Sequence, residues 1–140
     1  MVVLDTNVVS EIIRVRSDPR VEYWLARQDR ASVYITAITE AELRFGAAIL
    51  PAGRRRDLLA GAIDGLLGED FTGRIIPFDS AAAARFAVIA AERRAIGRPI
   101  PEADCQIAAI VSIHNATLAT RNVSDFMGCG IRIFDPWATD

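Results

Sequence analysis

The sequence predicts an α/β protein in which helices cover both faces of a mainly parallel, five-stranded sheet. Short apolar runs of strand length alternate along the chain with longer segments of helical length. Such alternation is typical of parallel strands joined by helical crossovers. The chain has 140 residues, of which 51% are apolar and 24% charged, and it contains no repeat, low-complexity stretch or linker. We therefore expect one domain, residues 1–140.

Five short apolar runs are expected to form the strands. Each is bounded by polar or turn-forming residues, and none shows the alternation of a strand with one wet face. This pattern predicts strands that are buried on both faces. In chain order, the expected strands are Val2–Leu4, Val33–Ile35, Arg74–Pro77, Thr117–Ala119 and Ile131–Phe134.

Three helices are expected between the first strand and residue 50. Thr6 or Asn7 can cap a helix over Val8–Arg14. A proline favours the start of a second helix, Pro19–Arg27, because its ring presets φ for the first turn. The third helix, Ala37–Leu50, stops before the next proline.

Three further helices are expected in the rest of the chain. Arg54–Leu67 carries large apolar side chains spaced for one buried face, and Leu58 is among them. Ala81–Ala95 is rich in alanine and ends before Gly97. The last of these helices runs over Pro101–Ile113.

Composition excludes several classes of protein. All 16 basic residues are arginines, so the chain lacks the lysine that a P-loop or a Schiff base requires and that receiver domains rely on. The single histidine, His114, argues against a histidine metal site or a serine triad, and we expect it at a surface or helix end. Cys105 and Cys129 are too few for a disulfide scaffold or a zinc site.

Charge and hydropathy bear on location and partners. No run of about 18 apolar residues and no leader pattern is present, so we expect a cytoplasmic protein without a membrane span. The formal net charge of −2 offers no overall basic surface for nucleic acid. The only dense basic cluster, Arg54–Arg56, is either a solvated helix start or a contact for RNA or an acidic partner.

Polar residues follow two of the expected strands. Ligands of parallel α/β sheets bind beyond the carboxyl ends of the strands, near a switch in strand order. Asp5 closes the first strand and should emerge at that edge, although it could simply cap the next helix. The segment Thr120–Phe126 leaves the fourth strand in the same way, and a plain turn is the alternative interpretation.

Glu42 is expected on a buried face of its helix. It follows Ile38 by four residues and precedes Phe45 and Ile49 at helical spacing, which places a carboxylate on an apolar stripe. A buried carboxylate is costly unless it is paired or binds a metal, so we interpret Glu42 as functional, with a structural ion pair as the alternative. Glu40 has an arginine four residues later and is expected to form a solvated pair.

Asp104 repeats this pattern. It shares a helix face with Ile100, Ile107 and Val111. Stabilisation of the helix dipole is the alternative role, although Glu102 can fill it from a more exposed position. Carboxylate oxygens gathered without His or Cys suit Mg²⁺ or Mn²⁺, and such sites hydrolyse phosphodiesters with a metal-activated water.

Several short motifs, in this order and spacing, resemble the PIN-domain family. More closely, they resemble VapC-type toxin ribonucleases of type II toxin–antitoxin pairs, in the FitB-like branch. The resemblance implies a three-layer α/β/α sandwich, Mg²⁺- or Mn²⁺-dependent endoribonuclease activity on RNA, dimerisation and inhibition by a cognate antitoxin. The motifs are Leu4–Asn7, Pro19–Leu25, Ile38–Gly46, Ala103–Asp104, Thr120–Phe126 and Phe134–Trp137.

The same resemblance implies a set of site residues. Many members of the family carry Asp at the position of Asn122, whereas others keep Asn there and place an acid three residues later, as Asp125 does here. The metal-binding and catalytic acids implied are Asp5, Glu42, Asp104 and Asp125. The supporting residues implied are Thr6, Asn7, Thr120 and Asn122, of which the first two would orient Asp5 or a metal-bound water.

Two other functions stay open. The fold could serve a DNA-directed module, but the chain has no DNA-reading motif, so we expect DNA binding only through the antitoxin. It could also be a non-enzymatic module that acts through a partner. A homodimer or a toxin–antitoxin hetero-oligomer is expected, for which Trp24 and Phe86 are candidate contacts unless they pack in the core.

Overall fold

The computed structural model describes residues 1–138 and places five strands in one sheet. Their order is β3-β2-β1-β4-β5, and all four neighbouring pairs are parallel, which confirms the expected sheet. Each strand lies within a residue or two of its expected bounds. The strands are β1 (Val2–Leu4), β2 (Val33–Thr36), β3 (Ile75–Ile76), β4 (Thr117–Ala119) and β5 (Arg132–Phe134).

Helices form the connections between the strands, as expected. Two short elements of other helical types, η1 and η2, precede β2 and follow α4. The α-helices are α1 (Thr6–Ile12), α2 (Pro19–Ala26), α3 (Ala37–Ala48), α4 (Arg54–Gly65), α5 (Ser80–Ala95), α6 (Glu102–Ile113) and α7 (Val123–Phe126). The short elements are the 3₁₀ turn η1 (Arg30–Ser32) and the π-helical turn η2 (Leu66–Asp70).

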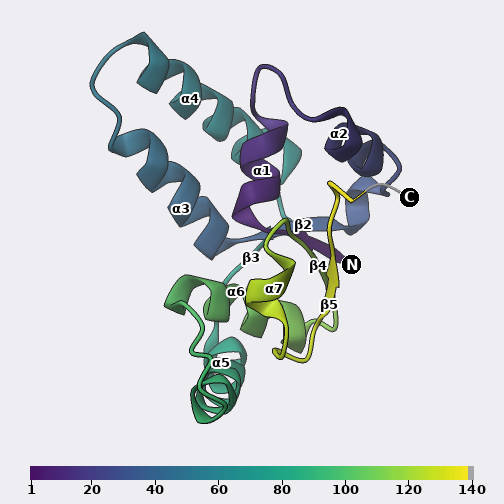
Figure 1. The fold of residues 1–140 in the computed structure, drawn as a ribbon. Coiled ribbons are helices and arrows are strands. Elements are labelled where there is room, and N and C mark those ends of the chain that lie inside the picture. The colour runs from purple at the N-terminus through teal and green to yellow at the C-terminus, as the bar shows by residue number, and fades with distance from the viewer. Residues whose placement is uncertain (139–140) are drawn as a thin grey trace.

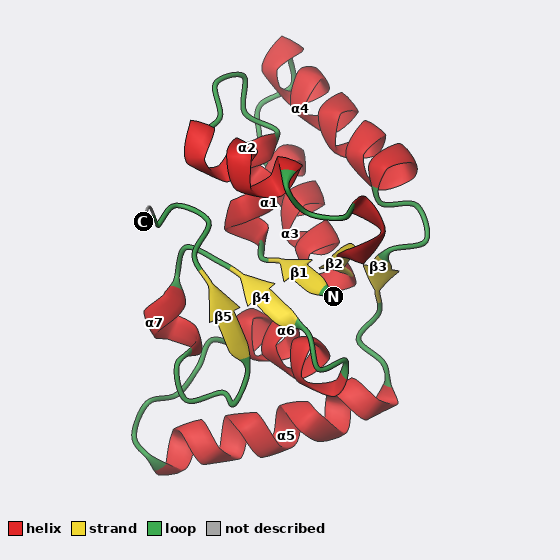
Figure 2. Ribbon diagram, turned by 90° about the vertical axis from the view of Figure 1, so that its right-hand side faces the viewer, coloured by secondary structure: helices red, strands yellow, loops and turns green. Residues whose placement is uncertain are grey.

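The helices cover both faces of the sheet, so the expected three-layer sandwich is confirmed. Helices α1 to α4 lie on one side and α5 to α7 on the other (Figures 1 and 2). Successive strand residues point to opposite faces, so Val3 joins the core under α5 and α6 while Leu4 joins the core under α1 and α3. Both side chains are fully buried, as the uninterrupted apolar run predicts.

The switch in strand order lies between β1 and β4. The chain moves outward from β1 to β2 and β3, then returns to the other side of β1 to add β4 and β5. Leu4 pairs in register with Ala119, so the residues that follow them, Asp5 and Thr120, leave the sheet side by side. This is the crevice in which parallel α/β sheets bind ligands.

Local structure differs from the expectations in three places. Asp5, rather than Thr6 or Asn7, is the N-cap of α1, because its Oδ1 accepts the Thr6 N–H. The helix expected to reach residue 67 ends at Gly65 and widens into η2, and Leu58 on it is 63% exposed rather than buried. The polar segment after β4 is more than a turn, since it contains α7.

Among residues 1–138, the structure places the single histidine and both cysteines as follows. His114 is the exposed C-cap of α6, as expected for a helix end. Cys105 and Cys129 are buried free thiols. Within that part of the chain, no helix combines the length and the apolar character that crossing a membrane would require.

Candidate active site

Asp5 lies at the centre of the switch-point crevice and is only 4% exposed. Its backbone N–H extends the β1–β4 ladder by donating to the Ala119 carbonyl at 2.9 Å. Its carboxylate accepts the Thr6 N–H at 2.9 Å on Oδ1 and the Thr120 hydroxyl at 2.7 Å on Oδ2. Asp5 therefore caps α1, as the alternative interpretation proposed, and it also emerges at the carboxyl edge of the sheet, as expected.

Asn7 and Thr120 join the two loops that flank Asp5. The Asn7 amide donates to Asp5 Oδ2 and to Thr120 Oγ1, both at 3.3 Å, and its carbonyl oxygen accepts the Arg121 N–H at 3.2 Å. Thr120 Oγ1 also accepts the Asn122 N–H at 3.0 Å. These bonds connect Asn7, Thr120 and the backbone of Asn122, three of the residues that the resemblance assigns supporting roles, to the surroundings of Asp5.

Glu42 reaches the same crevice from α3. The Thr6 hydroxyl donates to Glu42 Oε1 at 2.7 Å. A carboxylate can only accept, so the Thr6 oxygen in turn accepts from Thr39 at 3.0 Å, and Thr39 accepts from Thr36 at 3.5 Å. This chain of hydroxyls fixes the orientation of Glu42 relative to α1.

Sequence reasoning missed Thr36 and Thr39, both of which are fully buried. The sequence spacing could have indicated Thr39, because it precedes Glu42 by three residues and therefore shares its side of the helix. Thr36 ends β2 and caps α3 by accepting the Thr39 N–H at 3.1 Å. The first turn of α3 thus carries buried hydroxyl groups beside Ile38, which packs against the core.

The predicted reason for the importance of Glu42 was wrong. Glu42 is exposed, and Phe45 and Ile49, expected to be buried beside it, are each 65% exposed. The face of α3 that packs inward carries Thr39, Leu43 and Ala47 instead. Glu42 lies at the site because α3 begins directly after β2 at the carboxyl edge of the sheet, not because its stripe is buried.

Asp104 and Asp125 approach from the other face of the sheet. Asp104 is partly buried in the first turn of α6, on the side that continues into the buried Ile107 and Val111, as predicted. Asp125 is exposed on α7, the element that directly follows β4, the strand that pairs with β1. The side chain of Asn122, the alternative fourth ligand, is exposed at the N-cap of α7.

The four acids interact electrostatically without a neutralising partner. Burial raises the pKa of Asp5, against hydrogen bonds from Thr120 and Thr6, and the charges of Glu42 and Asp125 raise it further. Burial, followed by the charges of the other three acids, raises the pKa of Asp104 from its ordinary 3.8 to about 6. Among residues 1–138, no arginine forms an ion pair with any of the four.

The chemistry of this site suits a hard divalent cation that keeps part of its water shell. All its side-chain donors are oxygens, the ligand type that Mg²⁺ and Mn²⁺ prefer. Within the described part of the chain, no three His, Cys, Asp or Glu side chains converge closely enough to ligate one ion together. Mg²⁺ commonly binds through one or two carboxylates plus waters, so the oxygen donors present still fit such an ion.

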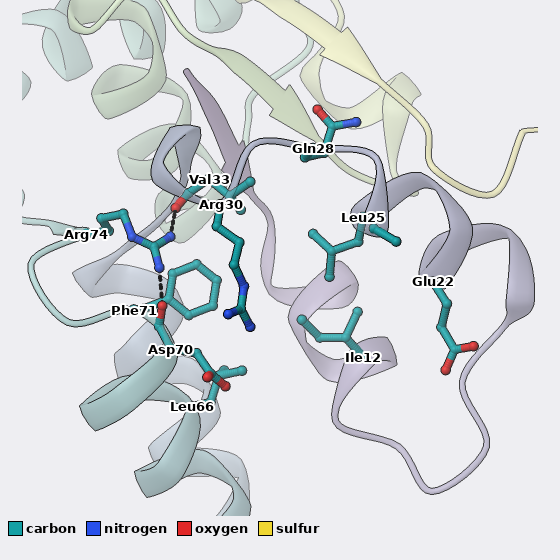
Figure 3. Close-up of a pocket in the computed structure, with 11 residues that line it drawn as sticks. Ile12, Glu22, Leu25, Gln28, Arg30, Val33, Leu66, Asp70, Phe71 and Arg74 are labelled. Carbon is teal, nitrogen blue, oxygen red and sulfur yellow. Dashed lines mark hydrogen bonds between the residues drawn. The ribbon is translucent and has the colours of Figure 1, made fainter.

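A separate cavity of about 430 Å³ lies away from the acids, between α1, α2 and η2. Its walls include the apolar side chains of Ile12, Leu25 and Phe71 (Figure 3). Arg74 borders it and donates to the backbone carbonyls of Val33 and Asp70. Arg74 therefore connects β2 to the end of η2.

The aromatic side chains proposed as interface candidates have core contacts. Trp24 stacks on Phe134 with ring centroids 5.5 Å apart, and Phe86 meets Phe78 edge to face at 6.0 Å. Both are partly buried, as the core-packing alternative predicted. In the Arg54–Arg56 cluster at the start of α4, Arg54 and Arg55 are exposed and Arg56 is half-buried, so a solvated helix start and a contact for RNA or an acidic partner both stay predictions.

By fold and site, the chain is an α/β/α-sandwich protein with an acidic centre at the carboxyl edge of a parallel sheet. Residues 2–125 match the family model described as the PIN domain. VapC ribonuclease Y4jK of Sinorhizobium fredii is 40% identical over 137 residues, which cover 98% of each chain. Toxin FitB of Neisseria gonorrhoeae is 39% identical, over 98% of this chain and 99% of its own.

Solved structures agree with these relatives. FitAB bound to an IR36 DNA fragment superposes with a TM-score of 0.93 at 38% identity, over 100% of this chain and 98% of that one. VapBC from Salmonella typhimurium, also bound to DNA, has a TM-score of 0.78 at 28% identity, over 96% and 97%. The chain belongs to the PIN-domain family and, within it, to the group of VapC and FitB toxins. The resemblance found in the sequence is thereby confirmed.

Proposed function

We propose that this toxin is a metal-dependent endoribonuclease of a type II toxin–antitoxin pair, formed by residues 1–140 as one PIN domain. The observation that carries the proposal is the group of four carboxylates at the switch point of the sheet, where burial and neighbouring negative charges raise the pKa of Asp5 and of Asp104. Acids whose pKa is raised in this way, without a basic partner, are typical of functional sites. The name of the relative Y4jK, a VapC ribonuclease, supports RNA as the substrate.

The chain's own residues would divide the work as follows. Asp5, Glu42, Asp104 and Asp125 would hold Mg²⁺ or Mn²⁺, one or two of them directly and the others through waters on the ion. The bound ion would supply an activated water and stabilise charge on the phosphate. Thr6 and the hydroxyl chain behind it orient Glu42, while Asn7 and Thr120 orient Asp5. Asn122 would support the loop beside Asp125 through its bond to Thr120.

We further propose that a cognate antitoxin protein is the partner of this chain, in a hetero-oligomer that includes toxin homodimers. The solved relatives FitAB and VapBC are toxin–antitoxin complexes, some of them bound to DNA. The exposed Phe45, Ile49 and Leu58 supply apolar surface of the kind that protein interfaces cover. DNA contact would come through the antitoxin.

The test is cleavage of a transfer-RNA pool by wild type and by Asp5→Asn, with Mn²⁺, with Mg²⁺ and with EDTA. We expect cleavage by wild type with either metal, none with EDTA, and a loss of at least about 100-fold for Asp5→Asn. Glu40→Gln is the matched control, since Glu40 pairs with Arg44 and not with the site.

Three results would contradict this proposal. Equal cleavage by wild type and Asp5→Asn would show that the activity lies elsewhere. Preferential cleavage of a single-stranded DNA of matching sequence would favour the DNA-directed alternative. Saturable Mn²⁺ binding without turnover of any RNA in the pool would favour the non-enzymatic one.

A further inference from the structure

Arg93, near the end of α5, places a charged guanidinium on the buried face of that helix. It is only 4% exposed. Among residues 1–138, it forms no ion pair with a carboxylate. A buried charge is costly unless it is paired or hydrogen-bonded. The hydrogen-bond partners of this guanidinium therefore indicate its structural role.

The partners are backbone carbonyls from two distant segments. Arg93 Nε donates to the Arg98 carbonyl at 2.7 Å. Its Nη1 donates to the carbonyls of Asp125 at 3.0 Å and Met127 at 3.2 Å, and lies 3.3 Å from Cys129 Sγ. Hydrogen bonds from a charged donor are about twice as strong as neutral ones. One side chain therefore binds the segment that carries Asp125 to the connection between α5 and α6.

The segment after α7 is shaped around this side chain. Met127 (φ −65°, ψ 136°) and Gly128 (φ +86°) form a type II turn, closed by the Cys129 N–H on the Phe126 carbonyl at 3.3 Å. A Cβ on Gly128 would lie 3.7 Å from Cδ of Arg93, so the turn rests on the stem of the arginine. Figure 2 shows α7 and α5 on the same side of the sheet.

The other segment is fixed by a reciprocal pair of bonds. The Arg98 N–H donates to the Arg93 carbonyl at 2.9 Å, while the Arg98 carbonyl accepts from Arg93 Nε. This pair sets the direction in which the chain leaves α5 towards α6, whose first turn carries Asp104. Arg93 thus binds the connection that leads into α6, which carries Asp104, and the backbone of the segment that carries Asp125. It forms no hydrogen bond with either carboxylate.

We propose that Arg93 is a positioning residue that sets the placement of Asp125 relative to Asp104 through the carbonyls of residues 98, 125 and 127. This inference rests on the proposed function, because it assigns Arg93 to the same acidic site. Two acids that must share one hydrated cation need a defined separation, and both lie on elements that do not pair in the sheet. Hydrogen bonds from Arg93 to the α5–α6 connection and to residues 125 and 127 would provide that separation.

The experiment measures Mn²⁺ affinity by calorimetry for wild type, Arg93→Met, Arg93→Lys and the control Arg94→Met. Met keeps most of the stem and removes every donor, whereas Lys keeps the charge but lacks the two-ended fork. Arg94 is the exposed neighbour on the same helix. We expect Mn²⁺ binding about tenfold weaker for Arg93→Met, an intermediate loss for Arg93→Lys and no change for Arg94→Met.

A mutant cycle separates positioning from general stability. If Arg93 acts through Asp125, Arg93→Met should weaken Mn²⁺ binding less than about twofold in an Asp125→Asn background. Amide hydrogen exchange should quicken in residues 122–129 for Arg93→Met and stay unchanged elsewhere in the domain. If Arg93→Met does not fold, the same measurements are made on Arg93→Lys instead.

Several results would overturn this inference. They are unchanged Mn²⁺ affinity in a folded Arg93 variant, an equal loss with and without Asp125, and failure of both Arg93 variants to fold, which would make Arg93 a stability residue. Wild type that neither binds Mn²⁺ nor cleaves RNA would instead refute the proposed function, and the role of Arg93 with it. The wild-type control therefore distinguishes the two failures.

Discussion

Replacing Asp104 by asparagine should stabilise the metal-free protein. Burial and the charges of three neighbouring acids raise the pKa of Asp104 from 3.8 to about 6. At neutral pH its carboxylate is ionised in the folded and the unfolded chain, but ionisation costs more free energy in the folded one. Asparagine keeps the shape of the side chain and removes the charge, so this cost should disappear.

The expected gain in stability of Asp104→Asn follows from the pKa shift of Asp104. Two pKa units correspond to about 3 kcal/mol at 1.36 kcal/mol per unit. Asp104 is only partly buried, so solvent screening reduces this to about 1 to 2 kcal/mol. For a chain of 140 residues, we expect Asp104→Asn to raise Tm by about 3 to 8 °C at pH 7.5.

The sign of the pH dependence provides a second measure. A carboxyl whose folded pKa is raised binds more protons in the folded state between its two pKa values, so stability falls as pH rises from about 4 to about 6. The metal-free wild type should therefore lose about 1 kcal/mol between pH 5 and pH 7.5 that Asp104→Asn does not lose. The difference between the two proteins isolates Asp104 from all other titrating groups.

The assay is thermal and urea unfolding in EDTA at pH 5 and pH 7.5. Glu102→Gln is the control, because Glu102 lies in the same first turn of α6 but is exposed. Its loss should leave stability unchanged or lower it by up to about 1 kcal/mol, since it removes a favourable charge near the helix N-terminus. The reasoning fails if Asp104→Asn is no more stable than wild type at pH 7.5, or if the two proteins differ equally at both pH values.

Three further predictions concern the same residues and the buried thiols. Saturating Mg²⁺ should raise the Tm of wild type in unfolding scans and raise that of Asp104→Asn by less, because a ligand stabilises the state that binds it; an equal rise would contradict the site. Glu42→Gln should lower RNA cleavage by at least about 100-fold in a gel assay, whereas Glu40→Gln, which disturbs a surface pair, should change it less than about twofold. Burial raises the pKa of Cys105 to about 11 and also raises that of Cys129, so both thiols should react with Ellman's reagent only after unfolding; fast reaction in the native state would refute this.

The strand ends could be predicted because they depend only on patterns within short segments. An apolar run followed by a polar residue places Asp5 and Thr120 at the carboxyl edge of a parallel sheet wherever their strands lie in it. That β1 and β4 are neighbours is a matter of topology, which the local pattern does not contain. The closeness of Asp5 and Thr120 therefore needed either the family resemblance or the structure.

The environment of Glu42 shows where periodicity stops being informative. Helix α3 has two faces of similar apolar content, one with Leu43 and Ala47 and one with Phe45 and Ile49. Periodicity identifies both faces but not which of them packs inward. The smaller side chains fit between the sheet and α4, so the larger pair is left exposed and available to a partner.

Arg93 is the converse case. It follows Ala82 by eleven residues and Ile89 by four, which places it on the buried face of α5. Helical spacing relative to apolar residues wrongly predicted that Glu42 is buried, but the same rule would correctly predict that Arg93 is buried. Its partners are carbonyls in irregular segments, however, and the course of such segments cannot be read from composition.

The capping and metal-binding interpretations of the acids turn out to be compatible. Asp5 caps α1, and Asp104 lies in the first turn of α6, where the partial positive charge of a helix N-terminus favours an acid. That partial charge holds each carboxylate in place without neutralising it as an arginine would. Setting aside the four site acids leaves 16 arginines against 14 acids, so the rest of the chain carries a small positive charge. The negative charge of the protein is thus concentrated where a divalent cation can offset it and still accept a phosphate.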